Sequence, residues 1–378
     1  MLIGESGIAK DVCPFRFMSK YYDKETELYY FGYRYYDPNS CKWLSRDPLG
    51  EQGGVNLTAF CENDPINSVD PFGLAGYFFG GTGNHNFEKN IDGTKNILSN
   101  VETLFRAWDV NKNKKVFYVP GVFSGYTPEG KPYDRKWYLL GGRGMMSEGA
   151  RGATLGDRVS YMVTLLEKQL EAGDKEVNVF GFSRGSTEAL EFLNRISDKI
   201  GKDSRYNGIR INFVGLWDIV KYASSKYRTE LPQNLNYIHN PIHCIAIDEQ
   251  RSQFFDEEVL NVQRAVQVGF RGKHADVGGG YYDSEFAWLS RDLVLSLAGK
   301  ANLAFSSDVI DQFPHDKYWK AIPTDNDTPY YNDHEKRTFP SDMYLHPSVR
   351  SFNQYSKSLN SVDNFIKQNR WFGDGIWK

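Results

Sequence analysis

The chain has 378 residues, which is long enough for one large domain and a smaller module. Its net charge of −3 gives no basic footprint, so we expect no nucleic-acid partner. No apolar run approaches the length of a transmembrane helix, and the N-terminus lacks the basic stretch and apolar core of a signal peptide. We therefore expect a protein that another machine must carry if it acts outside its cell of origin.

The cysteines do not indicate a metal or redox site. None of the four stands in C-x-x-C spacing, and three lie in the N-terminal segment while one is remote, so we expect reduced thiols at Cys13, Cys41, Cys61 and Cys244.

Residues 14 to 74 alternate aromatic, strand-favouring runs with Pro- and Gly-containing turn signals, which predicts short strands joined by turns. The segment resembles the conserved end of Rhs (YD-repeat) proteins. The matching stretches are Tyr21–Asp23, Leu28–Pro38, Trp43–Pro48 and the pattern P-x4-D-P-x-G-L from Pro65 to Leu74.

In the Rhs family a variable toxin domain follows this signature, so the resemblance implies a remnant over 1–74 and a toxin domain over 75–378. The family shell also cuts itself after the leucine with two aspartates. Carried over, these are Asp47 and Asp70, with Leu74 before the cut. Two close carboxylates cannot both ionise, so one becomes an acid. The long repeat region of the family is missing here, and a remnant that docks without cutting remains the alternative.

From Ala75 onward strands and helices alternate, which predicts an α/β fold with a mainly parallel sheet covered on both faces. We expect strands at 77–79, 116–119, 177–180, 211–216, 243–247 and 265–268. We expect helices at 93–108, 157–171 and 284–298, and one after residue 185 whose apolar face carries Ala189, Leu190, Leu193 and Ile196. Residues 300–378 have no clear period, and helices or a cap are expected there.

The sequence G-F-S-R-G from Gly181 to Gly185 follows an apolar run and precedes a segment with helical spacing. Strand, G-x-S-x-G and helix in this order are typical of the nucleophile elbow of α/β hydrolases, with glycine where the turn is too tight for side chains. Ser183 is therefore the candidate nucleophile. The backbone N–H of Arg184, at the helix start, is placed to bind a developing oxyanion, and the helix dipole adds to this.

For the acid, Asp218 ends a buried-looking strand, and the carboxyl ends of strands are where open α/β sheets place their sites. An acid there can hold an imidazole in the required tautomer; an ordinary helix N-cap is the alternative. Asp248, which also follows a strand, is the main rival. Asp276 is close in sequence to the candidate histidine and is expected to shape its loop.

For the base, one of the seven histidines stands out. His274 lies in a glycine-containing loop after a strand, which can place an imidazole over the elbow. The order Ser183, Asp218, His274 is the order of the α/β hydrolases. The weaker candidates, for which a structural role is expected, are His85, His239 and His243.

Three segments together resemble the type VI secretion lipase-effector hydrolases: Gly181–Gly185, Leu216–Asp218 and His274–Tyr281. The resemblance implies an α/β-hydrolase fold and a phospholipase-type antibacterial toxin, with a cognate immunity protein and a secretion apparatus as partners. Such a protein starts in the bacterial cytoplasm and is delivered to the periplasm or membrane of a target cell. The family usually opens with D-G-T-x-N, whereas this chain has Gly80 in place of the aspartate. Gly81 and Thr82 remain candidates for the second oxyanion donor.

The resulting hypothesis is a serine hydrolase toxin acting on phospholipid esters, with no metal or organic cofactor required. Ser183 attacks the acyl carbonyl, His274 moves the proton and Asp218 orients His274. Two alternatives stay open: an esterase for a soluble or peptidoglycan-linked substrate, and a catalytically inactive binding module.

Overall fold

The structure is a computed structural model, and it divides into two compact units, Met1–Gly73 with Lys168–Lys175, and Leu74–Glu167 with Glu176–Lys378. The expected domain boundary after Leu74 remains a prediction. The residues that the structure describes are 21–30, 34–40, 42–45, 74–89, 95–113, 115–132, 155–221, 227–249, 265–280, 287–310, 344–346 and 370–371.

In the first unit, the described residues between 21 and 45 form a small antiparallel sheet with the strand order β1-β2-β3-β4. Alternate side chains point to opposite faces, so Tyr29, Tyr36 and Trp43 pack together on one face while Tyr30 and Tyr35 stay partly exposed on the other. The strands are β1 (Tyr21–Asp23), β2 (Leu28–Tyr30), β3 (Tyr35–Asp37) and β4 (Lys42–Trp43). Short strands joined by turns, as predicted from the sequence, are confirmed for these residues.

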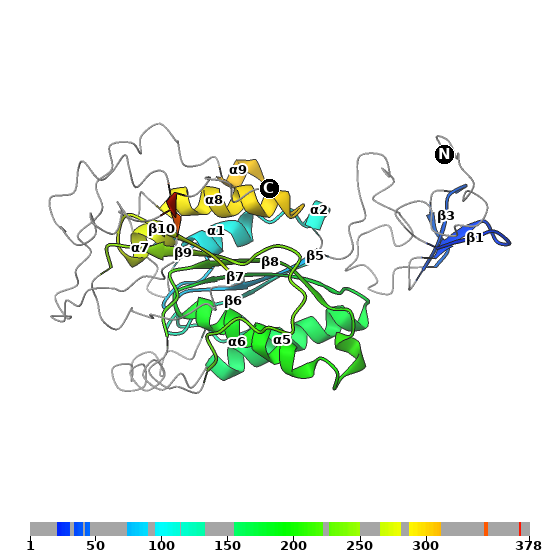
Figure 1. The fold of residues 1–378 in the computed structure, drawn as a ribbon, viewed down its shortest axis with the longest axis horizontal. Coiled ribbons are helices and arrows are strands. Elements are labelled where there is room, and N and C mark those ends of the chain that lie inside the picture. Colours follow the sequence, from blue (N-terminus) through cyan, green and yellow to red (C-terminus); the bar gives the residue numbers. More distant parts are fainter. Residues whose placement is uncertain are drawn as a thin grey trace. The chain divides into compact units, whose positions relative to one another are not determined.

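The second unit is built on an eight-stranded sheet with the order β12-β11-β10-β9-β8-β7-β5-β6 (Figure 1). Every neighbouring pair is parallel. The strands are β5 (Leu74–Phe79), β6 (Val116–Val119), β7 (Glu176–Phe182), β8 (Arg210–Trp217), β9 (Ile242–Ala246), β10 (Val266–Phe270), β11 (Tyr344–Leu345) and β12 (Arg370–Trp371).

Helices cover both faces of this sheet (Figure 1): α1 (Asn100–Ala107) and α8 (Ala287–Lys300) lie on one face, α5 (Leu155–Glu171) and α6 (Arg184–Lys199) on the other. Strands β7 and β8 are buried almost throughout, as a parallel sheet between two helical layers requires. The predicted doubly wound α/β fold is confirmed. The shorter elements are α2 (Val110–Asn113), a 3₁₀ turn at Ser204–Tyr206, α7 (His274–Gly278) and α9 (Ser307–Ile310).

Helix α1 begins later than its sequence suggests. The apolar spacing predicts a helix over 93–108, but residues 95–99 are not helical and residues 90–94 lie outside the described part. The cause is a capping arrangement, because the Glu102 carboxylate accepts hydrogen bonds from the backbone N–H of Ser99, at 2.9 Å, and from its hydroxyl. A serine with glutamate three residues later is a known start signal for a helix.

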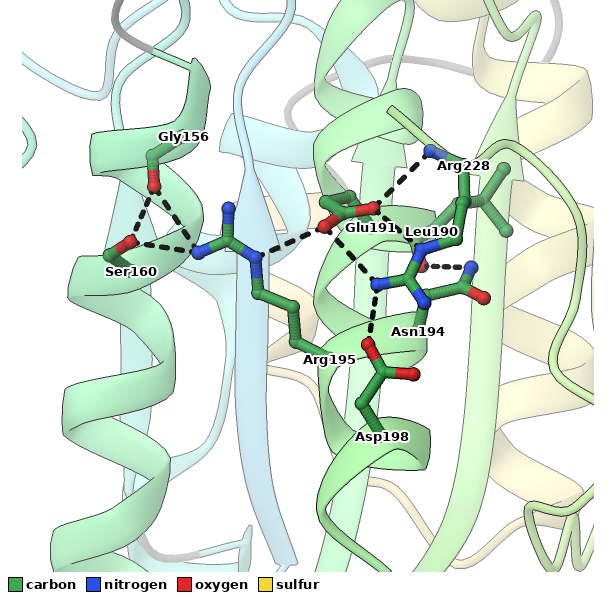
Figure 2. Close-up of polar contacts among 8 residues, drawn as sticks. All are labelled: Gly156, Ser160, Leu190, Glu191, Asn194, Arg195, Asp198 and Arg228. Carbon is green, nitrogen blue, oxygen red and sulfur yellow. Dashed lines mark hydrogen bonds and ion pairs between the residues drawn. The ribbon is translucent and has the colours of Figure 1, made fainter. Parts of the chain in front are cut away.

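A cluster of charged side chains joins α5, α6 and the segment that leads from β8 back to β9 (Figure 2). On α6, Glu191 accepts hydrogen bonds from the guanidinium of Arg195, at 3.1 Å, and from the backbone N–H of Arg228, at 3.2 Å. Arg195 also reaches the hydroxyl of Ser160 on α5, while Arg228 forms an ion pair with Asp198 at 2.8 Å. This cluster attaches the segment between β8 and β9 to helices α5 and α6.

The chain after residue 300 contributes two short edge strands to the sheet. β11 pairs with β10, and β12 pairs with β11. The sequence predicts helices or a cap in this region, and of these only the short helix α9 lies in the described part. The two strands are too short to show a period in the sequence.

Candidate active site

Ser183 occupies a sharp turn between β7 and α6. Its φ of 57° and ψ of −128° place a non-glycine residue in a strained region of backbone space, which indicates a functional turn. A side chain at Gly185 would place its Cβ 2.3 Å from the carbonyl oxygen of Phe79, and one at Gly181 would meet backbone at 2.8 Å. Only glycine fits on either side of Ser183, as the motif predicts.

Asp218 lies beside this turn because β7 and β8 are neighbours. The register pairs Phe182 with Trp217, and the backbone N–H of Ser183 donates to the carbonyl of Trp217 at 3.0 Å. Asp218 follows with a positive φ of 34° and is fully buried. Its Oδ1 accepts a hydrogen bond from the backbone N–H of Ala246 at 2.9 Å, so the neighbouring strand β9 fixes the carboxylate.

The structure brings His274 to Asp218. Nδ1 of His274 lies 2.7 Å from Oδ2 of Asp218, and both side chains are buried. His274 is the first residue of α7, and its backbone N–H donates to the Glu249 carboxylate at 3.1 Å. Its ring also stacks on Phe182, the residue before Ser183, with centroids 4.7 Å apart. Ser183 is thus adjacent in the chain to Phe182, which contacts His274, and is hydrogen-bonded to Trp217, which directly precedes Asp218.

The rival acids have other partners. Oδ2 of Asp248 accepts hydrogen bonds from the Arg271 guanidinium and from the backbone N–H of Gly272, each at 2.7 Å. Asp276 accepts one from the backbone N–H of Lys273 at 2.8 Å. Asp248 and Asp276 thus hold the loop that leads into α7.

The remaining candidate histidines have partners other than Asp218 or lie outside this contact. His243 is buried between the backbone N–H of Ile219, at 3.3 Å, and the side chain of Gln267, at 3.2 Å. His85 is buried, and the side-chain nitrogen of Asn96 donates to its backbone carbonyl at 2.6 Å. His239 lies in the segment before β9.

The loop after β5 approaches the start of α6. The Arg184 guanidinium donates to the Thr82 hydroxyl at 3.1 Å. A Cβ on Gly81 would lie 2.7 Å from the Phe182 ring, and one on Gly121 would lie 1.7 Å from the Gly81 carbonyl oxygen. The candidate oxyanion residues Gly81 and Thr82, in the loop after β5, therefore lie close to Arg184, the first residue of α6 after Ser183.

Burial shifts the pKa values of three ionisable groups in the second unit. Desolvation raises the pKa of Glu188 on α6 to about 8, although the charge of Arg158 opposes the shift. Burial also raises the pKa of Glu102 and, together with the charge of Asp218, that of the free thiol Cys244. Glu188 is thus protonated over much of the neutral pH range.

Phe182, Ala246 and Glu249 are contacts of the candidate site that the sequence reasoning did not assign. For Phe182 and Glu249 the sequence offers only an indication by position, because Phe182 stands inside the G-x-S-x-G motif and Glu249 follows the rival Asp248. Among the described residues, no three His, Cys, Asp or Glu side chains gather as metal ligands would, and no helix is long and apolar enough to cross a membrane. Asp47 and Asp70 lie outside the described residues, and Leu74 begins β5.

Comparison with known proteins confirms both resemblances expected from the sequence. Residues 186–298 match the family model described as "T6SS, Phospholipase effector Tle1-like, catalytic domain", a range that includes Asp218 and His274 and begins just after Ser183. A solved structure of the Tle1 effector bound to the VgrG spike of the type VI secretion system aligns with 55% of this chain and 51% of its own, at 18% identity and a TM-score of 0.39.

The N-terminal part is similar to parts of much longer proteins. It is 48% identical over 61 residues to the toxin protein Tse5 of Pseudomonas aeruginosa, covering 16% of this chain and 5% of that protein. It is 43% identical over 58 residues to RhsB of Dickeya dadantii, named as a probable deoxyribonuclease, covering 15% and 4%. The chain therefore spans only a small part of these relatives.

Proposed function

We propose that this chain is a serine hydrolase toxin that cleaves ester bonds of phospholipids with Ser183, His274 and Asp218. The observation that carries the proposal is the 2.7 Å contact between Asp218 and His274 beside a strained turn that holds Ser183. A carboxylate on Nδ1 orients the imidazole and leaves Nε2 as the proton acceptor, which is the arrangement a serine nucleophile needs.

The reaction then follows the acyl-transfer scheme. Ser183 attacks the acyl carbonyl and passes its proton to His274, which gives it to the leaving alcohol. Asp218 stabilises the imidazolium, and water releases the acyl group. The backbone N–H of Arg184, at the start of α6, and a donor from Gly81 or Thr82 would bind the oxyanion.

The phospholipid substrate is supported by the match of residues 186–298 to a family described as phospholipase effectors. The same match supports delivery to a target cell by a type VI secretion apparatus. We further propose that the enzyme acts in the periplasm or at the membrane of that cell and that an immunity protein protects the producer. A soluble or peptidoglycan-linked ester remains the second candidate, because the elbow and the acid–base pair specify acyl transfer and leave the acyl group open.

A lipid panel tests the proposal. Purified wild-type protein and Ser183→Ala are incubated with defined phospholipids, and the products are detected by mass spectrometry. We expect lysophospholipid and free fatty acid from the wild type alone. A fluorophosphonate probe, which labels activated serines, separates the alternatives. Labelling without lipid turnover favours another ester, whereas a protein that neither labels nor hydrolyses is a binding module.

A further inference from the structure

Two buried polar side chains outside the candidate triad hold together the elements that carry it. Asn100 is the first residue of α1 and is 3% exposed, and Ser290 lies in α8 and is fully buried. The side-chain nitrogen of Asn100 lies 2.8 Å from the carbonyl oxygen of Ala287, 3.0 Å from that of Val277 and 3.1 Å from Oγ of Ser290. Three segments distant in sequence thus meet at one amide group.

Ser290 extends these contacts to the end of β8. Its Oγ accepts a hydrogen bond from the indole N–H of Trp217 at 3.0 Å. The hydroxyl has one hydrogen, and the shorter of its two acceptor distances, 2.6 Å, is to the carbonyl oxygen of Val277. The polar hub formed by Asn100, Trp217, Val277, Ala287 and Ser290 is therefore hydrogen-bonded in the core, where a buried polar group left without a partner is destabilising.

The hub connects the two elements whose side chains meet at the site. Trp217 directly precedes Asp218, and Val277 lies in the same short helix as His274. The end of that helix also rests on the start of α1, because Gly279 pairs with Ser99 in an isolated bridge and a Cβ on Gly279 would lie 3.0 Å from the Cα of Ser99.

We propose that Asn100 and Ser290 are positioning residues that set the distance between the end of β8 and α7, and so hold Asp218 against Nδ1 of His274. The proposal rests on the function proposed above. A helix of five residues has little stability of its own, so its position depends on such contacts. Loss of the hub lets α7 shift, and a misplacement of about 1 Å can reduce a catalytic rate by on the order of 10²-fold.

Kinetics on a soluble p-nitrophenyl ester test this proposal with Ser290→Ala, Ser290→Thr and Asn100→Leu. We expect Ser290→Ala and Asn100→Leu to lower kcat and the rate of fluorophosphonate labelling by roughly 10- to 100-fold, with KM changed less than about threefold. Ser290→Thr retains the hydroxyl and should recover most of the rate.

The matched control is Asn212→Leu. Asn212 is also a buried amide in this domain, and its nitrogen donates to Asn178 at 2.9 Å and to the Ala301 carbonyl at 3.1 Å, near the other end of β8. Its loss should destabilise the fold without lowering the kcat of the folded protein. If Asn212→Leu lowers kcat as much as Asn100→Leu does, the hub has only a structural role.

A measurement that needs no substrate separates this proposal from the proposed function. The proton on Nδ1 of a histidine bound to a carboxylate gives a low-field proton NMR signal, which His274→Ala identifies. The signal should weaken or vanish in Ser290→Ala and Asn100→Leu and persist in Asn212→Leu. If the NMR signal persists in Ser290→Ala and Asn100→Leu, the positioning role is wrong. If the signal is lost in these variants as expected but the protein has no activity that depends on Ser183, only the proposed function is wrong.

Discussion

The imidazole of His274 stacks on the ring of Phe182, with centroids 4.7 Å apart and planes inclined by 27°. Phe182 is the last residue of β7 and directly precedes Ser183, so this contact places α7 against the turn. Gly278 approaches the same ring so closely that a Cβ would lie 1.9 Å from it. The aromatic residue inside the G-x-S-x-G motif is therefore a packing surface for the candidate base.

Removal of this surface should impair catalysis more than folding. We expect Phe182→Leu to lower kcat by about tenfold or more, because the imidazole loses the ring that limits its movement. Phe192→Leu is the control, since Phe192 is buried in α6 and contacts Tyr77 and Phe79 instead. Steady-state kinetics and urea unfolding of both variants distinguish a loss of catalysis from a loss of stability. Equal effects on kcat would show that His274 does not depend on Phe182.

The triad assignment makes a sharper prediction. Ser183→Ala, Asp218→Asn and His274→Ala should each lower ester hydrolysis by on the order of 10³-fold or more, because triad members act as a unit. Asp248→Asn should stay far more active, since the Asp248 carboxylate is bound to Arg271 and Gly272. Rates are compared on samples with native circular dichroism. If Asp218→Asn is near wild type and Asp248→Asn is inactive, the acid is Asp248.

Glu188 should make stability fall as pH rises. Its pKa is raised from 4.5 to about 8 in the folded protein because the side chain is buried. Between these values the folded state holds a proton that the unfolded state has released, so raising the pH favours unfolding by up to about 1.4 kcal/mol per pH unit. This contribution to stability is complete below pH 4.5 and is lost as the pH rises toward 8.

Urea unfolding at pH 5, 6, 7 and 8 checks this expectation. Glu188→Gln has nearly the same shape and does not titrate, so its stability should exceed that of the wild type at pH 8 and depend less on pH. Glu230→Gln changes an exposed glutamate and serves as control. Parallel pH curves for wild type and Glu188→Gln would refute the argument.

Much of the fold could be predicted from the sequence, because its signals are local. Val116–Val119 was expected as a strand from four strand-favouring residues before Pro120, and the structure has the same bounds. The late start of α1 is different, because the apolar period runs on through residues that the Ser99–Glu102 contact excludes from the helix. The edge strands β11 and β12 have two residues each, too few to show alternation.

The candidate site likewise contains some residues that the sequence indicates and others that it does not. Ser183, Asp218 and His274 follow strands that end at one edge of the sheet, so chain order and motif were enough to nominate them. Asn100 and Ser290 carry no such signal. Their hydrogen bond joins positions 190 residues apart, and nothing in either neighbourhood indicates the other. Contacts of that kind depend on how the helices pack, which a single sequence does not reveal.

The Rhs-like segment leads to a prediction about processing. If Asp47 and Asp70 form a working pair, fresh protein should be cut between Leu74 and Ala75, and Asp70→Asn should abolish the cut. Strand β5 lies between β6 and β7, and Ala75 is buried at its start, so we expect the cut protein to keep its fold and its esterase activity. Intact mass measurement distinguishes the outcomes, and one uncut species would support a remnant that docks without cutting.

The last prediction concerns the target of the enzyme. Residues 186–298 match a phospholipase effector family and follow an Rhs-like segment, an arrangement that fits an enzyme delivered to another cell. Its substrate would then be met at the periplasmic face of a membrane. We expect expression directed to the bacterial periplasm to slow growth, and expression without a signal sequence to have little effect. Ser183→Ala should relieve the growth defect, and lipid extracts from the affected cells should gain lysophospholipid and free fatty acid.

Growth curves and lipid mass spectrometry measure both effects in the same cultures. Toxicity that persists in Ser183→Ala would reject a role for the serine, and toxicity that depends on Ser183 with unchanged lipids would favour a soluble or peptidoglycan-linked ester.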